Sequence, residues 1–265
     1  MNYPNTHIHP DAKIGNNVTI DPFTVIHNDV EIGDGTWIGS SVTIFQGARI
    51  GKNCRIFPGA VISAVPQDLK FGGEITTAEI GDNTTIREFV TINKGTKANG
   101  KTVVGSNNLL MAYVHVAHDC IIGNNCILAN GATLAGHIVI DDFAIIGGLS
   151  AIHQFVHIGS HVMISGGSLI KKDVPPYIKA AREPLAYMGL NSVGLRRRGF
   201  NNEKIAEIQN IYRIVFQQGN NRSQALQVIE NELSVSAERD SIISFMKGST
   251  RGLLRGNSTN GMDED

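Results

Sequence analysis

The sequence is poor in cysteine, in net charge and in long apolar runs. Its three cysteines, Cys54, Cys120 and Cys126, are spaced neither as a disulfide framework nor as a four-ligand zinc site. A net charge of -1 over 265 residues argues against a nucleic-acid binder, although the basic cluster from Arg196 to Arg198 could meet an anionic partner. No apolar run approaches the roughly 20 residues of a transmembrane helix, and the polar start lacks the apolar core of a signal peptide. We therefore expect a cytoplasmic protein without a transmembrane segment.

An aliphatic residue recurs at every sixth position, a period that no ordinary helix or hairpin shows. Isoleucine holds this phase from Ile8 to Ile62, and aliphatic residues resume it at Ile80 and again from Val104 to Ile170. Many of these residues precede glycine, often with Asn or Asp nearby, which suits a chain that bends repeatedly at positive φ. Three such six-residue units make one triangular turn of 18 residues, and turns stack roughly 4.8 Å apart through parallel-sheet hydrogen bonds. The sequence predicts a mainly β protein, with a parallel β-helix of hexapeptide repeats over residues 1–185.

A small residue follows four positions after each aliphatic one and gives a second inward-facing position. All three cysteines occupy this class of position. We therefore interpret them as small core residues and not as nucleophiles.

The repeat is interrupted and then ends. Its phase fails at Asp68, Glu74 and Ala98, so we expect segments 63–79 and 93–103 to leave the coil as loops, where function often concentrates. After Pro175 and Pro176 the repeat stops. A helical pattern begins at about residue 201, with an apolar face and a stop at Gly219, and further helices are expected over 223–233 and 237–247. We assign residues 186–256 to a C-terminal helical domain and residues 257–265 to a disordered tail.

Six of the nine histidines lie between residues 115 and 161, and the 18-residue turn predicts which of them meet. His118, Gly136 and Gln154 stack on one face in successive turns, and Asp119 lies beneath His137 in the adjacent column. An imidazole beside a carboxylate, with a glycine N–H one turn above, offers a general base and an oxyanion donor, as acyl transfer requires. Two alternatives stay open: solvated histidines on the coil faces, and a zinc site formed by histidines of neighbouring turns.

At these residues the chain resembles the UDP-N-acetylglucosamine acyltransferase family that begins lipid A synthesis. The stretches that carry the resemblance do not repeat; they are Gln67-Asp68-Leu69-Lys70, His115-Val116-Ala117-His118-Asp119-Cys120, residues 130–137, His153-Gln154-Phe155 and Arg197-Arg198-Gly199-Phe200. The resemblance implies a left-handed coil, an exception to the right-handed crossover rule. It also implies a homotrimer with active sites between subunits, and transfer of a 3-hydroxyacyl chain from acyl carrier protein to the 3-hydroxyl of UDP-N-acetylglucosamine.

The resemblance also implies roles for individual residues. His118 would be the general base, Asp119 would orient it, the Gly136 N–H would receive the oxyanion, and Gly166 would be the ruler that leaves the acyl groove open for a long chain. The residues expected to line the substrate positions are Gln67, Asp68, Lys70, His115, His137, His153, Gln154, Asn191, Arg197 and Arg198. Asn93 and Val193 depart from the family pattern, where histidine and an acidic residue are frequent, so nucleotide recognition is expected to differ in detail.

No cofactor is expected, because a thioester is already activated. Three rival functions remain for comparison: an N-acyltransferase acting on a UDP-glucosamine derivative, a zinc-dependent hydratase on the same coil, and an inert structural solenoid. The sequence leaves the acyl length, the stereochemistry at the hydroxyl and the choice between the ordinary sugar and an amino analogue undetermined.

Overall fold

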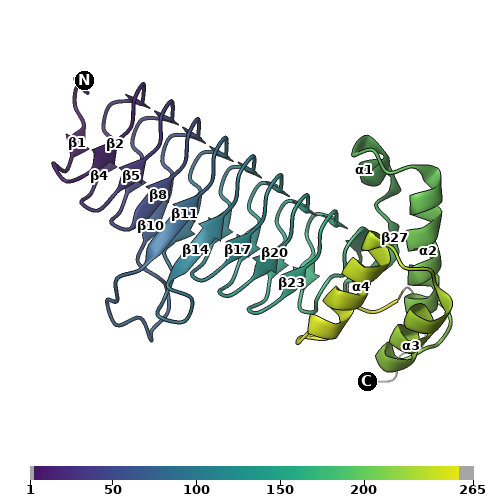
Figure 1. The fold of residues 1–265 in the computed structure, drawn as a ribbon. Coiled ribbons are helices and arrows are strands. Elements are labelled where there is room, and N and C mark those ends of the chain that lie inside the picture. The colour runs from purple at the N-terminus through teal and green to yellow at the C-terminus, as the bar shows by residue number, and fades with distance from the viewer. Residues whose placement is uncertain (1–2, 257–265) are drawn as a thin grey trace.

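A computed structural model describes residues 3–256 and shows a triangular coil followed by a group of helices (Figure 1). Within these residues three sheets run along the coil, and nearly all their strands pair in parallel. The strands of the first sheet are β1 (His7–Ile8), β4 (Val25–Ile26), β7 (Thr43–Ile44), β10 (Val61–Ala64), β13 (Thr91–Asn93), β16 (His115–Val116), β19 (Thr133–Leu134), β22 (Ala151–Ile152) and β25 (Leu169–Ile170).

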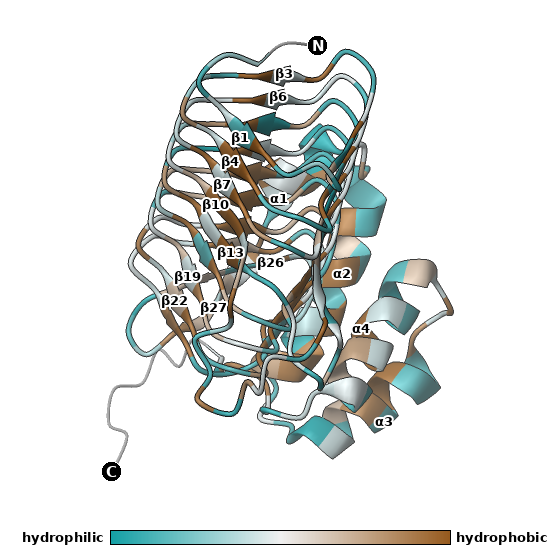
Figure 2. Ribbon diagram, turned by 90° about the vertical axis from the view of Figure 1, so that its left-hand side faces the viewer, coloured by the Kyte–Doolittle hydropathy of each residue, from teal (hydrophilic) through white to brown (hydrophobic). Residues whose placement is uncertain are grey.

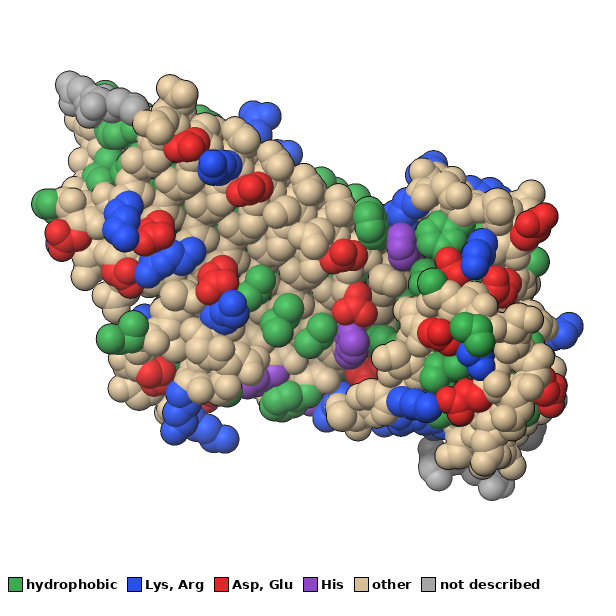
Figure 3. Space-filling view, viewed as in Figure 1, with side chains coloured by type: hydrophobic (Ala, Val, Ile, Leu, Met, Phe, Trp, Pro, Cys, Tyr) green, Lys and Arg blue, Asp and Glu red, His purple; other side chains and the backbone are tan. Residues whose placement is uncertain are grey.

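The other two sheets complete the triangle. The second contains β2 (Lys13–Ile14), β5 (Glu31–Ile32), β8 (Ala48–Ile50), β11 (Thr77–Ile80), β14 (Lys101–Val104), β17 (Ile121–Ile122), β20 (Val139–Ile140) and β23 (His157–Ile158). The third contains β3 (Thr19–Ile20), β6 (Trp37–Ile38), β9 (Arg55–Ile56), β12 (Thr85–Ile86), β15 (Leu109–Leu110), β18 (Ile127–Leu128), β21 (Ile145–Ile146), β24 (Met163–Ile164), β26 (Ile178–Ala181) and β27 (Ala186–Leu190). On the face of the coil that Figure 3 shows, charged side chains of both signs are interspersed.

The register of the sheets confirms the predicted 18-residue turn. His115 pairs with Thr133, and Val116 pairs with Leu134, so each aliphatic residue of the repeat lies directly on the one 18 residues before it. The apolar positions recur along the stacked strands (Figure 2) and fill the interior of the coil. The fold is therefore the left-handed parallel β-helix that the hexapeptide period and the resemblance led us to expect.

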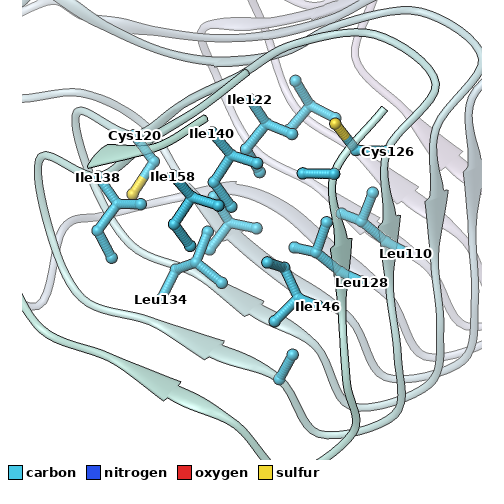
Figure 4. Close-up of a cluster of buried hydrophobic side chains, with 14 of the residues drawn as sticks. Leu110, Cys120, Ile122, Cys126, Leu128, Leu134, Ile138, Ile140, Ile146 and Ile158 are labelled. Carbon is cyan, nitrogen blue, oxygen red and sulfur yellow. The ribbon is translucent and has the colours of Figure 1, made fainter. Parts of the chain in front are cut away.

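All three cysteines lie in this core, as predicted. Cys54, Cys120 and Cys126 are fully buried and free, and Figure 4 shows the last two among the aliphatic side chains. Burial raises the pKa of both Cys120 and Cys126 to about 12. These thiols are protonated near neutral pH and fill space as small apolar groups.

The glycines that follow the aliphatic residues serve a different purpose from the predicted one. The residues with positive φ are mostly two positions further on, as at Asn17 and His137, with φ of 55° and 62°. Glycine at the earlier position is required by the next turn, because a Cβ on Gly33 would lie 2.6 Å from the Gly51 carbonyl carbon. The period in glycine therefore reports the close stacking of turns, and the corner itself is made by Asn, Asp and aromatic residues in the left-handed region.

Two loops project from the coil beside β10 and β14 (Figure 1). They are shorter than predicted, covering residues 65–76 and 94–100, because strands β10, β11, β13 and β14 extend into the expected segments. The added lengths show in the register, where Val61 pairs with Thr91 and Thr91 pairs with His115.

The helices cover the end of the coil after β27, which pairs antiparallel with β26. They are α1 (Ser192–Arg197), α2 (Asn202–Phe216), α3 (Arg222–Glu232) and α4 (Ala237–Gly248). Asn201, Asn221 and Ser236 cap the last three, whereas the short α1 has no apolar period and was not predicted. The buried Tyr212 hydroxyl donates to the Pro176 carbonyl at 2.7 Å and docks α2 onto the coil. Within residues 3–256 no helix is long and apolar enough to cross a bilayer, and the predicted tail over 257–265 lies outside the described residues.

Candidate active site

His118 follows β16 at the corner between the first and second sheets, and its side chain is buried against Asp119. Its Nδ1 lies 2.7 Å from Asp119 Oδ2. Asp119 adopts the left-handed backbone conformation, with φ of 61°, which aspartate tolerates better than most residues. This corner conformation is what allows two consecutive residues to turn their side chains toward each other. The dyad thus follows from the corner of the repeat.

The Asp119 carboxylate is 1% exposed and fully hydrogen-bonded. The Thr96 hydroxyl donates to Oδ2 at 2.7 Å, and the Thr96 and Asn99 backbone N–H groups donate to Oδ1 at 3.0 and 3.2 Å. Burial by itself raises the pKa of Asp119, but the hydrogen bonds from His118 and Thr96 more than offset it, so its pKa lies below the ordinary value. The side chain is therefore an anion at neutral pH, and it favours the His118 tautomer that carries a proton on Nδ1. That tautomer leaves Nε2 as a base.

Gly136 lies one turn above His118, as predicted, and its backbone faces the imidazole. A Cβ at this position would lie 2.6 Å from His118 Cε1 and 2.8 Å from Nε2. At the equivalent position of other repeats, the backbone N–H donates to a side chain of the next turn. The Asn16 N–H donates to Asp34 Oδ1, and the Asn124 N–H donates to Asp142 Oδ1. No acceptor among residues 3–256 takes the Gly136 N–H.

His137 and Asp68 complete the surroundings of the dyad. His137 packs edge-on against His118, with ring centroids 5.2 Å apart, and stacks on Phe155 at 4.7 Å. Its Nε2 lies 3.7 Å from Asp119 Oδ2, and Asp68 Oδ2, on loop 65–76, lies 4.0 Å from His118 Nε2. The structure thus brings together four of the predicted residues around the His118 imidazole.

The same group was also a candidate zinc site. Ligand atoms of His118, Asp119 and His137 lie within 4.8 Å of one another. However, two ligands bound about 2.0–2.1 Å from a tetrahedral zinc are about 3.3 Å apart, and the 2.7 Å between His118 Nδ1 and Asp119 Oδ2 is a hydrogen-bond distance. The observed geometry is therefore that of an imidazole hydrogen-bonded to a carboxylate.

The remaining predicted residues near this corner are mostly exposed. Gln67 and Lys70 lie on loop 65–76, and Gln154 lies one turn above Gly136. His153 is exposed and its Nδ1 contacts the Arg251 guanidinium at 3.1 Å. The set also includes His115, on β16, which meets the Thr91 hydroxyl at 2.7 Å and whose pKa is lowered by burial, so that it is neutral at pH 7.

Asn191 and Arg198 lie at a different corner, between the second and third sheets. Asn191 caps α1 and donates to the His161 carbonyl at 2.9 Å. Arg198 donates to the Phe143 carbonyl at 3.1 Å and lies over the Phe143 ring, whereas Arg197 is exposed. Within a single chain, these residues therefore lie at a different edge of the coil from His118.

Gly166 lies at the third corner, between β24 and β25, where the third sheet meets the first. It is exposed, and its neighbour in the turn below is Gly148, whose carbonyl would lie 3.1 Å from an added Cβ. The predicted residues therefore occupy three different edges of the triangular coil.

Three residues at the site were missed by sequence reasoning. Thr96 and Asn99 donate to Asp119, and the Asp119 N–H donates to the Thr102 hydroxyl at 2.8 Å. The break in the repeat at Ala98 marked their segment as a loop. The sequence carried no sign that this loop folds back onto the corner that holds His118 and Asp119, because that contact depends on the path of the loop.

Comparison with known proteins connects this site to a family. Residues 173–254 match the family described as UDP-N-acetylglucosamine O-acyltransferase, domain 2, and residues 29–64 and 101–136 match the bacterial transferase hexapeptide family. The acyl-[acyl-carrier-protein]–UDP-N-acetylglucosamine O-acyltransferase of Thiobacillus denitrificans is 40% identical over 195 residues, which cover 73% of this chain and 76% of the relative.

Solved structures of UDP-N-acetylglucosamine acyltransferases are also similar to this chain. The UDP-N-acetylglucosamine acyltransferase of Bacteroides fragilis is 56% identical with a TM-score of 0.95, and the match covers 96% of this chain and 100% of the other. The corresponding protein of Acinetobacter baumannii is 42% identical with a TM-score of 0.93, covering 96% and 99%. On sequence and fold together, the chain belongs to the UDP-N-acetylglucosamine O-acyltransferase family.

Proposed function

We propose that this protein transfers a 3-hydroxyacyl chain from acyl carrier protein to the 3-hydroxyl of UDP-N-acetylglucosamine, the first step of lipid A biosynthesis. Membership of the family supports the reaction. Two features of one corner carry the mechanism: the hydrogen bond between His118 and Asp119, and the Gly136 N–H one turn above it, which donates to no acceptor among the described residues. The reaction needs no cofactor, because the thioester is already activated, and we place it in the cytoplasm.

The residues present can carry out each proton transfer. His118 Nε2 takes the proton from the sugar 3-hydroxyl as its oxygen attacks the thioester carbonyl carbon. The Gly136 N–H donates to the oxyanion of the tetrahedral intermediate. As the intermediate collapses, the C–S bond breaks and the imidazolium returns its proton to the leaving thiolate of the carrier protein. Asp119 keeps the imidazole in the required tautomer and stabilises its positive charge.

The position of the other predicted residues supports an assembly with sites between subunits. His118, Arg198 and Gly166 follow different sheet edges, so a single chain cannot place all three around one substrate. In a homotrimer with parallel coils, an edge of one subunit faces a different edge of its neighbour. We therefore include the homotrimer in the proposal, with the nucleotide-binding Asn191, Arg197 and Arg198 and the ruler Gly166 supplied across the interface.

The proposal is tested with purified protein, UDP-N-acetylglucosamine and a panel of 3-hydroxyacyl and plain acyl carrier proteins, with products identified by mass. We expect an O-acylated sugar nucleotide, formed without added metal and unaffected by EDTA. Zinc in the purified protein, together with no acylated product, would instead support the hydratase class. Selective acylation of an amino-sugar analogue would favour the N-acyltransferase.

A further inference from the structure

Loop 94–100 is built around the side chain of Asp119. Of the four hydrogen bonds to this carboxylate, one comes from His118 and three come from the loop: the Thr96 hydroxyl at 2.7 Å, the Thr96 N–H at 3.0 Å and the Asn99 N–H at 3.2 Å. Thr96 is 7% exposed, so its hydroxyl has little access to water. The loop is the reason that Thr91 pairs with His115, 24 residues later, where a regular turn has 18.

The backbone of Asp119 is held by the same segment. The Asn99 side-chain amide donates to the Asp119 carbonyl at 3.2 Å, and the Asp119 N–H donates to the Thr102 hydroxyl at 2.8 Å. The Thr96 hydroxyl also accepts from the Ala98 N–H at 3.2 Å, which fixes the direction in which it donates. A loop that only filled a gap in the coil would not need this set of contacts to one residue.

The Asp119 carboxylate needs to be held in place because two imidazoles lie close to it. Asp119 Oδ2 lies 2.7 Å from His118 Nδ1 and 3.7 Å from His137 Nε2, so a small rotation of the carboxylate would exchange one partner for the other. The ionisable groups that face His118 are Asp119, Asp68 and His137. A carboxylate fixed by two backbone N–H groups and one hydroxyl cannot rotate freely, and its anion stays directed at His118.

We propose that Thr96 is a positioning residue for acyl transfer, which acts through Asp119 to hold His118 in its catalytic orientation and tautomer. The inference rests on the proposed function of His118 as the general base. It assigns a purpose to the second interruption of the hexapeptide repeat.

Thr96→Val tests the proposal, because it removes the hydroxyl and nearly keeps the shape of the side chain. We expect kcat to fall about tenfold with little change in KM; tenfold corresponds to about 1.4 kcal/mol, close to what a hydrogen bond to a charged group contributes. The acidic limb of the kcat/KM profile should move to lower pH, because a carboxylate that can turn toward His137 stabilises the His118 imidazolium less. Thr96→Ser keeps the donor and should restore both values.

Thr84→Val is the matched control. Thr84 is also buried, and its hydroxyl donates to the Gly105 carbonyl at 2.8 Å, away from the dyad. Its substitution should lower the melting temperature by a similar amount and leave kcat and the pH profile unchanged. Should Thr96→Val not fold, Thr96→Ala provides a second variant without the hydroxyl and without an added methyl group.

An activity-independent measurement separates this proposal from the proposed function. The His118 imidazole is titrated by NMR in protein labelled with ¹³C-histidine, and its signal is assigned from a His118→Asn spectrum. We expect its pKa to fall in Thr96→Val and to match the wild type in Thr84→Val and Thr96→Ser. An unchanged titration, or a loss of kcat in Thr96→Ser equal to that in Thr96→Val, overturns the positioning role. If the wild-type protein acylates no sugar nucleotide and the His118 titration still shifts in Thr96→Val, the proposed function is wrong and the positioning role of Thr96 remains supported.

Discussion

Gly136 offers the most direct test of the site, because its lack of a side chain is what lets His118 lie against the backbone of the next turn. In Gly136→Ala the new Cβ would lie 2.6 Å from His118 Cε1, whereas ordinary contacts begin near 3.4 Å. The ring must then retreat by the difference, about 0.8 Å. A displacement of about 1 Å can cost on the order of 10²-fold in rate.

The substitution keeps the Gly136 N–H, and Gly136 is not among the glycines with positive φ, so its backbone accepts alanine. We therefore expect kcat to fall about 100-fold while the melting temperature changes little. The assay is steady-state acyl transfer with a saturating long-chain 3-hydroxyacyl carrier protein. Gly248→Ala is the control, since a Cβ there meets no atom within 4 Å. A Gly136→Ala enzyme with near-wild-type kcat would refute the reasoning, because it would mean that the working imidazole does not lie where this geometry places it.

Three further predictions concern catalysis, chain length and pH. His118→Ala should lower kcat by roughly 10²- to 10⁴-fold without loss of folding, and Asp119→Ala should do less harm because Asp119 only orients and polarises the base; equal rates for Asp119→Ala and wild type would remove that role. Gly166→Met should shift kcat/KM toward short donors by about a hundredfold, as expected if its side chain displaces four methylenes at about 0.8 kcal/mol each; an unchanged preference with a lowered melting temperature would make Gly166 purely structural. Burial, with the charge of Arg198, lowers the pKa of His161 to about 4. Below about pH 6.5 the unfolded chain therefore protonates this imidazole, whereas the folded chain does not. The free energy of unfolding should fall by about 2 kcal/mol between pH 8 and pH 5. In His161→Phe the guanidinium unfolding midpoint should depend less on pH, and equal pH dependence in both proteins would contradict the shift.

The coil could be predicted from the sequence because its rules are local. A hexapeptide with one aliphatic residue cannot bury that residue alone, so every turn must place it on the turn before, and the 18-residue register follows by arithmetic. The same arithmetic placed Gly136 above His118 and the three cysteines in the core. Asp119, which follows His118 in sequence, could be chosen as its partner because the two are adjacent at a corner.

The tertiary structure decided what lies outside the repeat. The loops leave the coil, and no period specifies where they return, so the contacts of Thr96 and Asn99 with Asp119 and the approach of Asp68 to His118 became visible only in three dimensions. The short α1 has too few residues to show an apolar period, and it forms because Asn191 caps it against the coil end. The glycines were read as corners because glycine favours positive φ, whereas the neighbouring turn, about 4.8 Å away, is what excludes their side chains. The sequence determined which side chains lie above one another along the coil, and the fold decided which atoms from different turns and loops converge on His118.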